Sequence, residues 1–412
     1  MGATIPPNWD LAKSAPVGPT TAVLCENELC KRIAARNAGP QGTVRGSGGG
    51  LTMDVYDGLR EVLHKNPIGA PKSAALDEIL KLLFTPQEAA VAQKMTFAPM
   101  SPQQIADAVG LPLDETAIIC EAMAKKGVVF SREKKGVIGY ALLPTVPGLF
   151  EFPLMRGVTS PFHEKLAALW NQYHDEALGH ELGGGKTPVM RVIPVERTIQ
   201  TRNEVVPYEI VSRMLDSPEY FAVAQCACRV SVGACDRPRD TCLMFDGTAR
   251  FLVDRGIARK IHRDDAQATL LRAEEAGLVH MCNNSRDRLT VICNCCSCCC
   301  TMLTVLTRLH NPNAFAGSRW HASVDSNACT GCAVCEDERC PVGAITLTDE
   351  IAYVDEDRCI GCGLCVSACS GDAIMMIHRS DPLAPPSTVQ EMGMNVLMEK
   401  GRLKDYLALH KR

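Results

Sequence analysis

Two runs of cysteines near the C-terminal end of the chain carry the clearest chemical signal in the sequence. Each run begins with the spacing C-x-x-C-x-x-C and is followed by a fourth cysteine. The members are Cys329, Cys332, Cys335 and Cys340 in the first run, and Cys359, Cys362, Cys365 and Cys369 in the second. Thiolates are soft ligands, and three at this spacing can surround one face of a cubane iron–sulfur cluster. Zinc sites usually combine two C-x-x-C pairs, so the pattern favours iron–sulfur clusters over zinc or disulfides.

Residues 322–380, which contain these runs, resemble a bacterial-type ferredoxin domain with two 4Fe–4S clusters. In that family the fourth cysteine of each run binds the cluster of the other run. The resemblance implies one ligand set of Cys329, Cys332, Cys335 and Cys369, and another of Cys359, Cys362, Cys365 and Cys340. The first run departs from the family, because four residues instead of three separate its last two cysteines, and Ser370 replaces the usual proline after the second. We expect the extra residue to bulge one loop without removing a ligand.

A second constellation lies upstream, in the pattern C-x-C-x6-C-x6-C. Its members are Cys226, Cys228, Cys235 and Cys242. Four cysteines within seventeen residues of a reduced protein can supply all four ligands of one metal centre. A 4Fe–4S cluster is favoured over zinc because the same chain already carries cluster motifs.

The segment 293–300 reads CNCCSCCC, with cysteine at six of its eight positions. These are Cys293, Cys295, Cys296, Cys298, Cys299 and Cys300. Small hydrophobic cysteines of a core would not crowd so tightly. Neighbouring side chains of an extended chain point in opposite directions, so the six cannot easily bind one cluster. We expect three or four to bind one cluster and the rest to pack or to bind a second centre. The region 226–300 then holds one or two further iron–sulfur clusters.

The C-A-C-R array at Cys226, the helix ending in A-E-E-A-G-L-V-H and the C-N-C-C-x-C-C-C run together resemble a recurring group of large ferredoxin-type proteins of anaerobic bacteria and archaea. In that group a winged-helix-like region precedes the cysteine arrays, and a two-cluster ferredoxin ends the chain. The resemblance covers most of residues 75–380. It implies an architecture and no particular substrate.

The helices and strands predicted around these cysteines indicate an α+β, multidomain fold. Ser101 can cap a short helix that ends at Gly110, and residues 113–126 form a second helix stopped by Gly127. Two strands around a Lys-Lys-Gly turn follow, so residues 51–145 resemble a winged-helix domain. The other predicted segments are an N-terminal arm and Gly-rich linker at 1–50, a connecting region at 146–222, a mostly helical cysteine-rich domain at 223–321, the ferredoxin domain at 322–380 and a C-terminal helix at 381–412.

Charge argues against DNA as the partner of the winged-helix-like region. Phosphate contacts dominate DNA affinity, and they require a basic surface. The candidate recognition helix has a net charge of −1, and the wing has a net charge of +2. DNA binding is therefore the less favoured function of this region.

Composition bounds the class of protein. The 412 residues suggest two to four domains, and the net charge of −4 indicates neither a nucleic-acid binder nor an acidic tail. No signal peptide opens the chain, and no run of eighteen apolar residues could span a membrane. We therefore expect a cytoplasmic protein. Its thiols are reduced there, so its 22 cysteines are metal ligands rather than disulfides.

These observations favour an iron–sulfur protein or subunit that passes low-potential electrons to or from a protein redox partner or oxidoreductase complex. A non-catalytic electron-transfer subunit of an oxidoreductase complex is favoured over an enzyme. No nucleotide-binding fingerprint is present, so flavin or NAD would bind to another subunit. One alternative is an oxidoreductase whose 293–300 region holds a substrate-binding cluster. Another is a redox-sensing winged-helix transcriptional regulator. The oligomeric state stays open, with a homo-oligomer among the alternatives.

Overall fold

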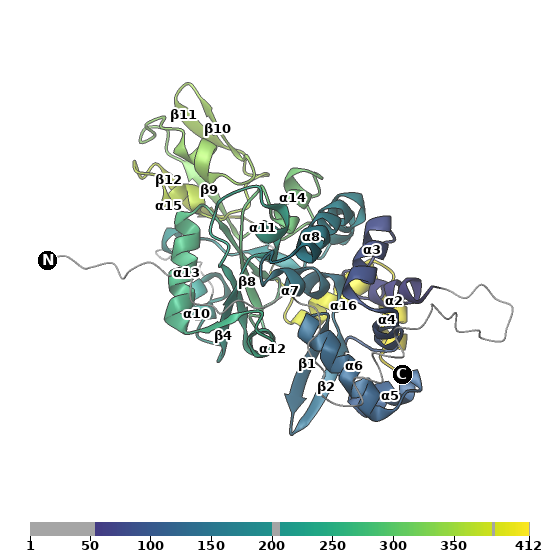
Figure 1. Cartoon of the computed structure of the whole chain (residues 1–412). Coiled ribbons are helices and arrows are strands. Elements are labelled where there is room, and N and C mark those ends of the chain that lie inside the picture. Colours follow the sequence, from purple (N-terminus) through teal and green to yellow (C-terminus); the bar gives the residue numbers. More distant parts are fainter. Residues whose placement is uncertain (1–53, 200–206, 381–383, 412) are drawn as a thin grey trace. The chain divides into compact units, whose positions relative to one another are not determined.

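The computed structural model describes residues 54–199, 207–380 and 384–411 (Figure 1). The predicted arm and linker at 1–50 lie outside these residues. Met53–Arg412 fall in one unit, in which helices and strands are mixed, as the α+β prediction requires. The predicted boundaries inside this unit stay predictions.

Five helices open the described chain. They are α2 (Val55–His64), α3 (Ala74–Leu83), α4 (Pro86–Ala92), α5 (Pro102–Val109) and α6 (Leu113–Lys126). Capping side chains begin several of them: Thr85 and Ser101 each complete a capping box, with Glu88 and Gln104 respectively. Gly110 and Gly127 end α5 and α6 with φ of 74° and 78°, a conformation that glycine adopts without steric cost.

A β-hairpin follows α6, so the helix–helix–hairpin order that the sequence predicts is present. Strands β1 (Val129–Lys134) and β2 (Val137–Leu142) pair antiparallel. Met100 forms a bridge with Tyr140 and adds a third short segment to the hairpin. Figure 1 shows α5, α6 and the hairpin grouped together.

The connecting region is helical and packs on the first helices. It contains α7 (Glu151–Leu154), α8 (Pro161–Tyr173), a π turn η3 (His174–Leu178) and α9 (Gly179–Leu182), after an irregular turn at Thr145–Leu149. Trp170 and Tyr173 of α8 are buried, and the Tyr173 hydroxyl donates to the Pro71 carbonyl oxygen at 3.1 Å. This anchors α8 beside α3.

The cysteine-rich region is built on a sheet, so the prediction of a mostly helical domain at 223–321 was wrong. Six antiparallel strands lie in the order β3-β7-β8-β5-β4-β6. They are β3 (Met190–Val192), β4 (Phe221–Ala224), β5 (Cys242–Phe245), β6 (Arg259–Ile261), β7 (Val279–Asn283) and β8 (Val291–Cys295). Every position of β5 and of β7 is buried. Strands covered on both faces show no alternation, so a short apolar run there reads equally well as a helix.

Helices connect and cover the strands of this sheet. They are α10 (Val211–Met214), α11 (Ala227–Val232), α12 (Asp246–Asp254), α13 (Arg263–Glu275) and α14 (Thr301–Thr307), with single 3-10 turns at Glu196–Thr198 and Pro207–Glu209. Helix α13 agrees with the predicted helix at 263–276, and Gly277 follows it with φ of 70°.

The ferredoxin-like region forms two small antiparallel pairs. Strand β9 (Trp320–Val324) pairs with β12 (Ile374–His378), and β10 (Ile345–Thr348) pairs with β11 (Ile351–Val354). A π turn η6 (Cys335–Arg339) and the short helix α15 (Leu364–Ser367) carry the middle of the two cysteine runs. In Figure 1 these elements lie next to α13.

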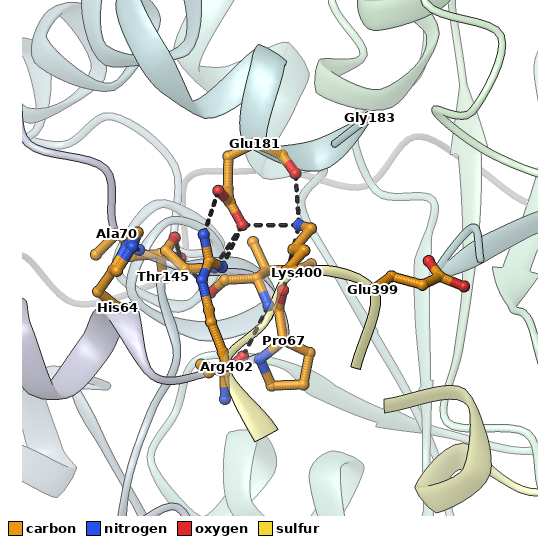
Figure 2. A network of polar contacts seen from close by, with 12 residues as sticks. His64, Pro67, Ala70, Thr145, Glu181, Gly183, Glu399, Lys400 and Arg402 are labelled. Atoms are coloured by element: carbon orange, nitrogen blue, oxygen red, sulfur yellow. Dashed lines mark hydrogen bonds and ion pairs between the residues drawn. The ribbon is translucent and has the colours of Figure 1, made fainter. Parts of the chain in front are cut away.

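The C-terminal segment forms two helices, α16 (Val389–Glu399) and α17 (Leu403–Leu409), where the sequence predicted one. Gly401, with φ of 68°, breaks them. The tail contacts α9 and the loop between α2 and α3. Lys400 and Arg402 both donate to the Glu181 carboxylate of α9, as Figure 2 shows. No helix in the described part of the chain is long and apolar enough to cross a membrane.

Candidate metal centres

Two cavities in the ferredoxin-like region are lined by cysteines of both runs. One cavity is lined by Cys329, Cys332, Cys335 and Cys369, together with apolar neighbours. The other is lined by Cys340, Cys359, Cys362 and Cys365. Each cavity therefore combines three cysteines of one run with the fourth cysteine of the other, which is the grouping that the ferredoxin resemblance implies.

Glycines before the second cysteine of each run let the loops fold this way. Gly331 and Gly361 have φ of 67° and 69°. A Cβ atom at Gly361 would lie 2.1 Å from the Trp320 carbonyl oxygen, and one at Gly331 would lie 2.6 Å from the Glu350 carbonyl oxygen. Side chains are excluded at both positions by backbone that cannot move aside.

The extra residue of the first run is accommodated by the π turn η6. The Cys340 N–H donates to the Cys335 carbonyl oxygen at 3.0 Å, one residue further along the chain than in an α-helix. The Ala344 N–H then donates to the Cys340 sulfur at 3.1 Å. The insertion bulges the loop as expected, and Cys340 still lines the cavity with the second run.

Burial makes the Cys362 and Cys365 thiols reluctant to ionise by themselves. Burial, with the neighbouring Cys359 and Cys340 thiols, raises the pKa of Cys362 to about 12. The same causes raise the pKa of Cys365. Iron supplies the positive charge that allows such thiols to bind as thiolates, so the donor set fits a metal cluster.

A separate group of thiols lies on the cysteine-rich sheet. The sulfur atoms of Cys235, Cys296, Cys298 and Cys299, called here the four-thiol group, all lie within 4.8 Å of one another. The Cys235 sulfur is 3.9 Å from those of Cys296 and Cys299. Cys296 and Cys299 are buried, whereas Cys298 is exposed. Four convergent sulfur ligands can hold an iron–sulfur cluster.

The expectation that the upstream array alone supplies one centre is not met by this geometry. Cys235 joins the four-thiol group, whereas the other three upstream cysteines contact the rest of the CNCCSCCC segment. The remaining six cysteines lie close enough for neighbouring thiols to interact, and they are called here the six-thiol group: Cys226, Cys228, Cys242, Cys293, Cys295 and Cys300. The CNCCSCCC segment is thus divided equally between two groups of thiols.

Sequence reasoning did not single out Arg229 as a residue of these sites. Only 1% of this residue is exposed, and one guanidinium nitrogen donates to the Asn294 carbonyl oxygen at 2.8 Å. The same nitrogen lies 3.8 Å from the Cys296 sulfur. The position of the arginine directly after Cys228 in C-A-C-R was the available signal.

A comparison with protein families finds a 4Fe-4S binding domain at residues 352–375. This segment contains Cys359, Cys362, Cys365 and Cys369. The chain therefore carries a 4Fe–4S binding domain, and the match covers a small part of its length. Comparisons with curated proteins and with solved structures gave no significant match.

Proposed function

We propose that the protein is a cytoplasmic iron–sulfur electron-transfer protein or subunit. In this proposal the ferredoxin-like region holds two 4Fe–4S clusters and the four-thiol group holds a third. Such clusters exchange one electron at a time, at potentials set by ligands, hydrogen bonds and burial. The partner would be a redox protein or oxidoreductase complex.

The segment from the last turn of α13 to the start of β7 supports this proposal most directly, because it contacts two groups of cysteines. Ala273 and Leu278 pack with Cys296 and Cys299 of the four-thiol group. On the other side, the Arg339 guanidinium donates to the Glu275 carbonyl oxygen at 3.0 Å. The four-thiol group and the ferredoxin-like region are therefore both in contact with this one segment.

The second cysteine run is the part of the ferredoxin-like region that contacts the sheet. The Val195 N–H donates to the Cys362 carbonyl oxygen at 2.9 Å, and Arg197 donates to the Ser367 carbonyl oxygen at 3.2 Å. Arg197 also pairs with Glu274 of α13. The cavity lined by Cys362 thus lies beside the segment that follows β3, which supports electron transfer between the ferredoxin-like region and the cysteine-rich region.

Metal analysis of anaerobically purified protein tests this function. We expect at least about eight iron atoms and as many acid-labile sulfides per chain, the content of two cubane clusters. Dithionite should produce the EPR signal of reduced 4Fe–4S clusters. The Cys362→Ser variant should lose iron, whereas Cys120→Ala, a buried thiol of α6 away from the cysteine groups, should keep it. Fewer than about eight iron atoms in the wild type would contradict the proposal.

A second candidate function, that of an oxidoreductase with a substrate-binding cluster, is supported by a cavity beside the four-thiol group. About 120 Å³ in volume, it is lined in part by Cys298, Cys299 and His174. His174 is buried and hydrogen-bonded to the Thr301 carbonyl oxygen at 3.0 Å. A cluster in the four-thiol group would be open to a small substrate from this cavity.

Cyanide, a small ligand for iron, distinguishes this second candidate. It should change the EPR spectrum of the reduced wild-type protein. It should have no effect on Val232→Trp, because the larger side chain would fill the cavity from an exposed position on its wall. An identical wild-type spectrum with and without cyanide leaves only the electron-transfer function.

A further inference from the structure

The six-thiol group is assembled by the pairing of two adjacent strands. Leu243 of β5 lies opposite Ile292 of β8, so the next residues along the ladder, Cys242 and Cys293, lie opposite each other. Side chains opposite each other point to the same face of a sheet. Cys295, two residues after Cys293, shares that face, and the two neighbouring thiols interact.

Two helix boundaries complete the group. Cys226 directly precedes α11, and Cys300 directly precedes α14. The Cys228 thiol of α11 interacts with the neighbouring thiols of Cys226 and Cys300, and Cys300 interacts with Cys295. One continuous series of sulfur contacts therefore joins β5, β8 and the two helix starts.

A buried positive charge lies between the six-thiol and four-thiol groups. Arg229 interacts electrostatically with Cys226 and Cys295 of the six-thiol group and with Cys296 of the four-thiol group. In the described part of the chain no carboxylate pairs with it, and its other donors reach only the Asn294 carbonyl and the Thr241 hydroxyl.

The environment of Arg229 requires an anion. A buried charge without a partner is strongly unfavourable, and arginine stays protonated in proteins. Neutral thiols would leave the guanidinium uncompensated, whereas metal-bound thiolates and cluster sulfides carry the negative charge that it needs. A dry core of protonated cysteines therefore does not explain why an arginine is buried among them.

We propose that Cys226, Cys228, Cys242, Cys293, Cys295 and Cys300 form a second iron–sulfur centre on the sheet, beside the four-thiol group and separate from it. This inference rests on the proposed function, and adds a centre to it. At least four of the six sulfurs bind iron, and Arg229 balances the charge of both centres. All six belong to one series of contacts, so the centre has more thiols than one cubane needs.

Paired variants test the inference on the full chain, purified anaerobically. Cys242→Ser/Cys293→Ser removes two opposite ligands of the six-thiol group, and Cys235→Ser/Cys298→Ser removes two sulfurs of the four-thiol group. Cys120→Ala is the matched control. Iron and acid-labile sulfide are measured per chain, and reduced samples are examined by EPR.

We expect Cys242→Ser/Cys293→Ser to lose about four or more iron atoms relative to Cys120→Ala, the content of at least one cubane. The loss should add to that of Cys235→Ser/Cys298→Ser when all four changes are combined, and the ferredoxin signals should remain. Unchanged iron in Cys242→Ser/Cys293→Ser would overturn the inference. Fewer than about eight iron atoms in the control would instead overturn the proposed function.

If far-UV circular dichroism shows that the double variants do not fold, the iron content of the wild-type chain tests the inference instead. The ferredoxin-like region and the four-thiol group together account for about twelve iron atoms as three cubanes. More than about twelve supports the six-thiol centre, and about twelve or fewer overturns it.

Discussion

Single residues decide which metal site each cysteine joins. Along the CNCCSCCC segment, Cys293 and Cys295 share one face of β8, and Cys296 begins the turn to the other group. The sequence alone predicted that the segment must divide, because alternation is a local property. It could not predict that Cys235 leaves its own array, since that depends on where the chain after α11 meets the segment.

Gly361→Ala tests a local requirement of the ferredoxin-like loops. The added Cβ would overlap the Trp320 carbonyl oxygen, and φ of 69° is itself unfavourable for alanine. We expect the variant to lose about half or more of the iron of the ferredoxin-like region, about four atoms, because Cys359 and Cys362 would be displaced. Gly247→Ala is the control, since a Cβ there meets no atom within 4 Å. Equal iron content in both variants would show that the loop tolerates the side chain.

At the scale of elements, the helices were the predictable part of the fold. Capping residues and glycine stops mark α5, α6 and α13 in the sequence, and the structure places these helices where expected. The central sheet was not predictable, because its strands are three to five residues long and join segments up to about a hundred residues apart. The divided C-terminal helix was missed although Gly401, at the break between α16 and α17, is the same kind of glycine stop.

Glu181→Gln tests the ion cluster that fastens α16 and α17 to α9 (Figure 2). Glu181 and Lys400 are each less than 10% exposed as side chains, and Arg402 is 15% exposed. Removing the carboxylate leaves two buried cations, so we expect a loss of about 3 to 5 kcal/mol in the free energy of unfolding. Urea denaturation followed by circular dichroism measures it. Glu78→Gln, at an exposed ion pair of α3, should have no measurable effect.

The pH dependence of this loss has a definite sign. Burial alone would raise the pKa of Glu181, but hydrogen bonds and charges from Arg402 and Lys400 outweigh it and hold the pKa at about 2, below its ordinary 4.5. A depressed carboxyl pKa stabilises the folded state above the unfolded pKa. The difference between wild type and Glu181→Gln should stay constant from neutral pH to about 5, and shrink as pH falls from 4.5 toward 2. A difference that grows on acidification would contradict this account.

At the scale of the whole molecule, the number of charged residues in a region does not by itself give the charge of its surface. Several arginines of the cysteine-rich region do not form a basic surface: Arg229 is buried, and Arg255 pairs with Glu121 at 2.8 Å. In the ferredoxin-like region, ten acidic residues oppose three arginines between residues 325 and 379. All ten except the half-buried Glu336 are exposed. The ferredoxin-like region therefore has an exposed negative surface.

This negative surface should attract a cationic electron donor to the ferredoxin-like region. Reduction by the methyl viologen radical cation, followed by stopped-flow absorbance, should slow about two- to fivefold as ionic strength rises from about 20 to 200 mM, because salt screens exposed charges. Asp349→Asn/Glu350→Gln, at the exposed β10–β11 turn, should reduce both the rate and its salt dependence. The control, Glu78→Gln/Asp107→Asn, neutralises two exposed acids of the N-terminal helices and should leave both unchanged. If the control slows reduction as much as the turn variant, net charge and not the ferredoxin-like surface would guide the donor.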